Sequence, residues 1–147
     1  MDAQKENGAR SYSEEIALLV ARCSQKALAC WAADCAGRVL PVFLSEKPDD
    51  CRPALAITAA REWASGRLKM SEARKAAFAA HAAAREMNVA AAVAAARSCG
   101  HAAATAHVAR HAVHAANYAA NAISLSNGNK EQERKWQLDR LREYSCL

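Results

Sequence analysis

The chain has 147 residues, of which 52% are hydrophobic and 24% are charged, and this composition is typical of one globular domain and excludes a disordered chain. The formal net charge is +5, which raises nucleic acid as a partner. However, the basic residues are spread along the chain and aromatic residues make up only 5%, so nucleic acid is disfavoured. No window of about 20 residues is apolar and free of charge, so we expect no membrane span.

The N-terminal part predicts a short flexible segment followed by three helices. Residues 1–10 are polar and lack a signal-peptide core, so we expect them to be flexible and the protein to be cytoplasmic. Ser11 and Glu14 fit a capping box that starts the first helix. Pro41 should kink or end the second helix. We expect the first helix to begin near residue 11, the second to run over about 26–44 and the third over about 53–65.

The C-terminal part predicts three or four more helices. We expect one helix at about 71–87, a second from Val89 onward with Asn88 as its cap, and a last one at about 130–144. A break near residues 108–111 would add another helix, because the chain could then reverse direction and the new helix could pack antiparallel to the one before it. Residues 11–147 are therefore expected to form a single all-α domain, an antiparallel array of six or seven helices with an alanine-rich core.

The stretch from 70 to 122 is close to half alanine. Alanine has the highest helix propensity of all residues, so this stretch is predicted to be helical, but it carries little bulk. Between 89 and 107, the only apolar side chains larger than alanine are Val89, Val93 and Cys99. Such helices bury surface only by packing closely against neighbours that carry large residues.

The six cysteines do not predict a disulfide framework. Cys23, Cys30, Cys35 and Cys99 lie within helical patterns and no CxxC pair occurs, so we interpret them as small buried hydrophobic residues. Outside these patterns, Cys51 and Cys146 are interpreted as exposed thiols.

All five histidines lie between residues 81 and 114. His107, His111 and His114 follow i, i+4, i+7 spacing, which on one unbroken helix would present three imidazoles to a zinc or nickel ion. However, the chain has no carboxylate between Glu86 and Glu131 to orient such ligands. We therefore treat these three as weak metal candidates, and expect no metal and no other cofactor.

Two polar stripes lie on neighbouring alanine-rich segments. Arg74, Phe78, His81 and Arg85 share one helical face, and Arg97, His101 and Thr105 share another. If the two helices are antiparallel neighbours, these stripes converge, and Asp34, Glu62 and Glu72 are the acids expected to meet the arginines. The candidate polar seam consists of Asp34, Arg61, His81, Arg85, Arg97, His101 and His107. It is either a salt-bridge network that fixes helix register or a cationic cleft for a carboxylate or phosphate.

Motifs for catalysis are missing from the sequence. The chain contains no GxSxG and no glycine-rich phosphate loop. Cys99 and His101 are close in sequence, but nearby helical positions point in different directions. We therefore predict no catalytic residues.

Five segments, taken in order, resemble a known family. They read WAADCAGRVL at 31–40, RPALAITAAREWASG at 52–66, RKAAFAAHAAAR at 74–85, AARSCGHAAATAHVARHAVHAANYA at 95–119 and KWQLDRL at 135–141. Together they resemble the immunity proteins of bacterial toxin systems, in particular the immunity-five-like group. The family pattern falls on Trp31, Asp34, Cys35, Arg52, Pro53, Arg61, Trp63, Phe78, His81, Arg85, Arg97, Gly100, His101, His107 and His111.

The resemblance implies a bacterial helical protein that binds and silences a cognate protein toxin. Trp136, Tyr144, Tyr118 and Arg110 are residue types that anchor interfaces. Because the chain carries a charge of +5, a toxin with an acidic or neutral face fits it better than the basic cleft of a nuclease. A homodimer is a further expectation, since twofold assemblies are common. The alternative is a helical protein, or an enzyme, that binds a small molecule or metal at an Arg/His site between the fourth and fifth helices.

Overall fold

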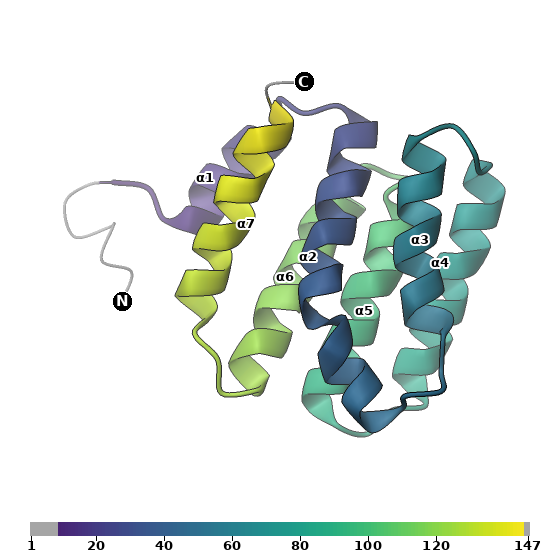
Figure 1. Cartoon of the computed structure of the whole chain (residues 1–147). Coiled ribbons are helices and arrows are strands. Elements are labelled where there is room, and N and C mark those ends of the chain that lie inside the picture. Colours follow the sequence, from purple (N-terminus) through teal and green to yellow (C-terminus); the bar gives the residue numbers. More distant parts are fainter. Residues whose placement is uncertain (1–8, 146–147) are drawn as a thin grey trace.

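A computed structural model describes residues 9–145, which form a bundle of α-helices with no strand in that range (Figure 1). The α1–α7 pair lies on one side of the bundle and the α3–α4 pair on the other. The all-α prediction is confirmed. The helices are α1 (Tyr12–Val20), α2 (Gln25–Glu46), α3 (Arg52–Ala64), α4 (Met70–Arg85), α5 (Ala90–Ala104), α6 (His111–Leu125) and α7 (Lys130–Ser145).

The helix ends agree with the sequence in part. Ser11 and Glu14 form the predicted capping box of α1, in which each side chain accepts a hydrogen bond from the other residue's backbone amide. Pro41 lies inside α2, which continues to Glu46, and the helix axis changes direction in its C-terminal part (Figure 1). The prediction that Asn88 caps α5 is wrong, because the cap position is Val89, which makes no side-chain cap hydrogen bond.

Helix α5 lies at the centre of the bundle. It packs against α2, α3, α4 and α6, and Figure 1 shows it behind α2 and α3, between α6 and α4. Most of its alanines are buried, together with Ser98, Cys99 and Gly100. Small side chains let the surrounding backbones approach closely, so that burial here comes from contact between backbones and alanine methyls. The predicted alanine-rich core is present.

The bulk of the core comes from α2 and from the two terminal helices. Trp31, Val39 and Phe43 of α2 are fully buried, as are Ile16 of α1 and Leu141 of α7. Because α2 contacts α3, α5, α6 and α7, its large side chains fill the space that the alanine helices leave. A few large side chains on α1, α2 and α7, packed against alanine-rich helices, are therefore enough to form one core.

Helix α2 is also the one helix of the described chain with the length and apolar composition that crossing a membrane requires, although it contains Asp34 and Arg38. Half of its apolar window is buried inside the bundle, and the core helix of a soluble protein meets the same criterion. The contacts of α2 with four other helices account for its apolar character.

The break after α5 comes earlier than predicted. Helix α5 ends at Ala104, the chain turns through residues 105–110, and α6 begins at His111. The Thr105 hydroxyl donates a hydrogen bond to the His101 carbonyl, inside the last turn of α5. The hypothesis of three histidines on one unbroken helix is therefore wrong, since His107 lies in the turn.

Of the cysteines, Cys35 and Cys99 are buried as predicted, whereas Cys23 and Cys30 are half-buried. Burial raises the pKa of the Cys99 thiol to about 12, which makes it a poor nucleophile at neutral pH. Cys51 is exposed, as expected, and Cys146 lies outside the described residues.

Candidate functional site

The predicted polar seam is divided in the structure into two separate clusters. Asp34 and Arg61 lie together at the junction of α2 and α3, whereas His81, Arg97 and His101 gather between α4 and α5. The expectation that Asp34 meets the arginines of α4 and α5 is wrong, because its partners come from α3 and α7.

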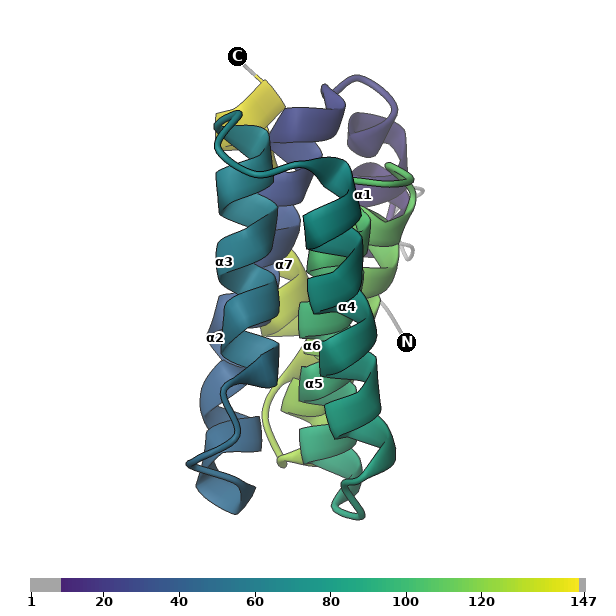
Figure 2. The same ribbon diagram turned by 90° about the vertical axis from the view of Figure 1, so that its right-hand side faces the viewer.

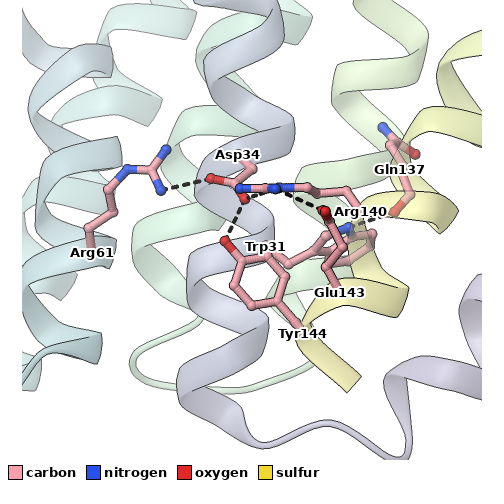
Figure 3. A network of polar contacts seen from close by, with 7 residues as sticks. All are labelled: Trp31, Asp34, Arg61, Gln137, Arg140, Glu143 and Tyr144. Carbon is pink, nitrogen blue, oxygen red and sulfur yellow. Dashed lines mark hydrogen bonds and ion pairs between the residues drawn. The ribbon is translucent and has the colours of Figure 1, made fainter. Parts of the chain in front are cut away.

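The first cluster is centred on the carboxylate of Asp34, whose side chain is only 10% exposed. Its Oδ1 accepts a hydrogen bond from Arg61 of α3 at 2.8 Å, and its Oδ2 accepts one from Arg140 of α7, also at 2.8 Å. The Tyr144 hydroxyl donates to the same Oδ2, and Figure 3 shows Asp34 between Arg61 on one side and the α7 residues on the other. We call this group the Asp34 junction. It ties three helices together.

The charge of Asp34 is maintained by these donors. Burial opposes its ionisation, but the hydrogen bonds from Tyr144, Arg61 and Arg140 outweigh burial and lower the pKa of Asp34. Conversely, burial and the bond to Asp34 raise the pKa of Tyr144 to about 12. Both side chains therefore stay in the protonation states that the junction needs. It is a structural network in which both oxygens of the carboxylate accept hydrogen bonds.

Helix α7 is held further down its length by buried amide contacts. The Trp31 indole donates to the Gln137 carbonyl at 2.9 Å, and the Gln137 side chain donates to the Ala116 carbonyl at 2.9 Å. Arg134, 5% exposed, donates to the Gln137 side-chain oxygen. These bonds fix α7 against both α2 and α6, and Figure 3 shows the one between Trp31 of α2 and Gln137 of α7.

The second cluster consists of imidazoles. The ring of His101 lies at the centre, 4.9 Å from the ring of His81 and 5.1 Å from that of His111 between centroids. The rings of His114 and Tyr118 lie 5.2 Å and 5.3 Å from it. We call these five residues the histidine cluster. Three imidazoles from α4 and α6, together with the Tyr118 ring, thus surround the His101 ring of α5.

The hydrogen bonds made by the histidine cluster require a neutral His81 and at least one neutral ring in the His101–His111 pair. Arg97 is a donor only, so its contact of 2.9 Å with Nδ1 of His81 makes that nitrogen an acceptor. The Nδ1 atoms of His101 and His111 face each other at 2.9 Å, and one of them has to accept. A proton on every ring would destroy both contacts.

The pKa values follow the same logic. Burial, together with the charges of Arg97 and Arg85, lowers the pKa of His81 to about 4. Burial and the neighbouring histidines lower the pKa of His101 to about 3. Burial also lowers the pKa of His111, with contributions from His114 and Arg110. These three imidazoles are neutral at physiological pH.

A hollow of about 190 Å³ opens beside the histidine cluster. Phe78 at its rim is 58% exposed, and the guanidinium of Arg74 lies 5.4 Å from the centre of the Phe78 ring. No carboxylate lines this hollow. Its lining residues are Arg74, Ala77, Phe78, His81, Ala104, His107 and His111.

The three weak metal candidates do not share one helical face. His111 and His114 stand on α6, with ring centroids 5.9 Å apart, while His107 lies in the turn before it. Within residues 9–145, no group of three or more His, Cys, Asp or Glu side chains is arranged to hold a metal ion.

Three of the four predicted interface anchors are half-buried and make contacts within the fold. The Trp136 ring lies under the guanidinium of Arg38, 4.2 Å from its centre, Tyr144 bonds to Asp34, and Tyr118 stacks on His101. Arg110 is exposed at the start of α6. Sequence reasoning also missed the ion pair of Arg38 with the buried Glu133, at 2.9 Å. The signal that could have indicated this ion pair is Glu133 itself, an acid at a core-facing position of α7.

Gly100 determines where the His81 ring sits. A Cβ atom at Gly100 would lie 2.7 Å from Nε2 of His81, so Gly100→Ala has to displace that ring and weaken its contact with Arg97. We expect the variant to lose about 1 kcal/mol of unfolding free energy, because the clash exceeds the helix propensity that alanine gains. Urea denaturation measures this loss.

Gly37→Ala is the matched control for this substitution. Gly37 also lies inside a helix, but nothing is within 4 Å of a Cβ placed there. The control should therefore gain about 0.5–1 kcal/mol from helix propensity alone. Equal effects of the two substitutions would contradict the packing role assigned to Gly100.

Comparison with protein families gives a match over most of the chain. The family model described as "Imm-5 like putative immunity protein" matches residues 18–144, a range that includes the Asp34 junction and the histidine cluster. The search of curated proteins found no significant match. The search of solved structures found none either.

Proposed function

We infer the function from one premise: the chain belongs to the family of Imm-5 like putative immunity proteins. We propose that the protein binds a cognate bacterial toxin and neutralises it by occupying the toxin, with no catalysis of its own. The observation that carries this proposal is the family match over residues 18–144.

The architecture suits a binding role. The bundle is closed by buried alanine contacts around α5 and fastened by the Asp34 junction, so its surface is held in one conformation before a partner arrives. A preorganised surface loses less entropy on binding, which favours tight inhibition. Homodimerisation stays a prediction.

A second candidate function is the binding of a small anion at the hollow beside the histidine cluster. It is favoured by one observation, the presence of Arg74 and three imidazoles in a hollow without a carboxylate. In this case the protein would hold a free carboxylate or phosphate compound rather than a protein.

Affinity purification followed by a growth assay tests the proposal. The tagged protein is isolated from its native bacterium at moderate salt with nuclease present, and the eluate is analysed by mass spectrometry for proteins and retained small molecules. We expect one stoichiometric partner that stops growth when expressed alone and permits growth when co-expressed with this protein. A partner that is harmless alone, or a retained small molecule without a partner, would overturn the proposal.

A further inference from the structure

One face of the bundle combines positive charge, an exposed aromatic ring and a hollow. Helix α4 lies on the outside of the bundle beside α3 (Figure 2), and the turn after α5 and the start of α6 border the same hollow. We call this surface the α4–α6 basic face. It consists of Arg74, Phe78 and His81 of α4, His107 and Arg110 of the turn, and His111 of α6.

The arginines of this face lack acidic partners. The structure of residues 9–145 gives no ion pair to Arg74 or Arg110, nor to Arg85 at the end of α4 outside the face. The two acids of α4 and its C-cap are already engaged, because Glu72 pairs with Lys75 and Glu86 pairs with Arg52. The chain between 87 and 130 contains no Asp or Glu, so neither α5 nor α6 can neutralise the face.

The structural arginines behave differently. Arg61 and Arg140 share Asp34, and Arg38 pairs with Glu133. Arginines that hold helices together are therefore paired with carboxylates, whereas the arginines of the α4–α6 basic face are not. Unpaired guanidiniums that a partner can desolvate and pair are the usual charged anchors of protein interfaces.

The hollow gives the α4–α6 basic face a cavity that a partner side chain can enter. Alanines 77 and 104 form small apolar walls, and imidazoles of His81, His107 and His111 supply ring nitrogens. A volume of about 190 Å³ accommodates one side chain rather than a folded segment. Phe78, 58% exposed, offers an apolar contact at the rim beside Arg74, the combination that is enriched in binding hot spots.

We propose that the α4–α6 basic face is the toxin-binding surface and that it receives an acidic patch of the toxin, one Asp or Glu carboxylate of which enters the hollow and pairs with Arg74. This inference rests on the proposed function and specifies its partner chemistry. A protein partner fits better than nucleic acid, because a phosphate backbone needs an extended basic track and stacking surfaces. This face has one exposed apolar ring, that of Phe78, and one short hollow.

Charge reversal at the face is the first test. Arg74→Glu should weaken binding to the toxin identified by the affinity purification about 100-fold, and Phe78→Ala about 10-fold. The control is Arg22→Glu, which makes the same change in net charge at an exposed position next to α1, a helix that packs on α7 and not on α4. It should change the affinity less than about threefold.

The outcomes separate the inference from the proposed function. If the wild-type protein protects cells and Arg74→Glu protects equally well, or Arg22→Glu is just as damaging, the inference is wrong and the function stands. If the wild type gives no protection, the function is wrong. In each case circular dichroism must show that the variants keep the helix content of the wild type and its midpoint of thermal unfolding.

A defined probe tests the surface without the toxin. A hexaglutamate peptide is titrated into the isotopically labelled protein at low salt, with hexaglutamine as the neutral comparison. We expect saturable NMR shifts in the His81, His107 and His111 rings and near Arg74, abolished by Arg74→Glu and retained in Arg22→Glu. No localised shifts, or stronger binding of a short DNA duplex to the same residues at physiological salt, would overturn the inference.

Discussion

Replacing Asp34 with alanine is expected to lower the free energy of unfolding by about 2–3 kcal/mol. The carboxylate accepts hydrogen bonds from Arg61, Arg140 and Tyr144, and its loss leaves all three donors without this acceptor. The arginine side chains are 46% and 39% exposed, so water can solvate them. For this reason we expect less than the loss of about 3–5 kcal/mol that follows when a fully buried pair is broken.

Urea denaturation near neutral pH measures the loss as a shift of the midpoint at constant slope. Asp34→Asn should cost about 1–2 kcal/mol, because the amide keeps an acceptor oxygen but loses the charge. The control is Asp139→Asn. Its partners Lys135 and Arg142 are on the same helix, and its side chain is 48% exposed, so the cost should be below about 0.5 kcal/mol. An Asp34→Ala variant as stable as the wild type would show that other contacts hold α7.

The Asp34 junction contains contacts between distant helices that the sequence alone does not predict. Asp34 and Arg61 could be singled out, but Arg140 and Tyr144 lie 106 and 110 residues further along the chain. Helical periodicity assigns a residue to a face of its own helix and does not reveal which distant helix covers that face. The same limit explains why the sequence does not reveal that Tyr144 and Trp136, which are half-buried, contact Asp34 and Arg38 of α2. Their role as interface anchors stays a prediction.

Local features were predictable because their causes are local. The capping box of Ser11 and Glu14 needs only residues of one turn. The approach of His81 to Arg97 and His101 was also foreseen, since α4 and α5 are joined by a short turn and each stripe was readable by itself. The position of His107 was not, because both continued helix and a turn were compatible with the alanine-rich sequence.

Acidification is expected to destabilise the protein before its carboxylates begin to titrate. The pKa of His101 is lowered to about 3 and that of His81 to about 4, whereas an unfolded histidine titrates near 6.5. Between these values the unfolded state binds protons that the folded state excludes, so stability is complete above about pH 6.5 and falls as the pH decreases. The aspartates and glutamates with lowered pKa values, such as Asp34 and Glu86, lose their contributions only below about pH 4.5.

The size of the effect follows from the two shifts. Each excluded proton costs about 1.4 kcal/mol per pH unit, or about 2 kcal/mol by pH 5 for each histidine. Because both rings are only half-buried, solvent screening reduces the sum to about 2 kcal/mol. Unfolding free energies at about pH 7 and pH 5 should therefore differ by this amount in the wild type.

His101→Gln isolates the origin of the pH dependence. The variant removes the ring with the lowest pKa, which is one of the two histidines whose protons the folded state excludes. The difference in unfolding free energy between about pH 7 and pH 5 should fall by about half, whatever the stability of the variant at neutral pH. If the variant kept the full difference, the histidine cluster would not be its source. An acidic partner seated at the α4–α6 basic face would favour protonated rings, so the same groups that weaken the free protein at low pH should strengthen its complex.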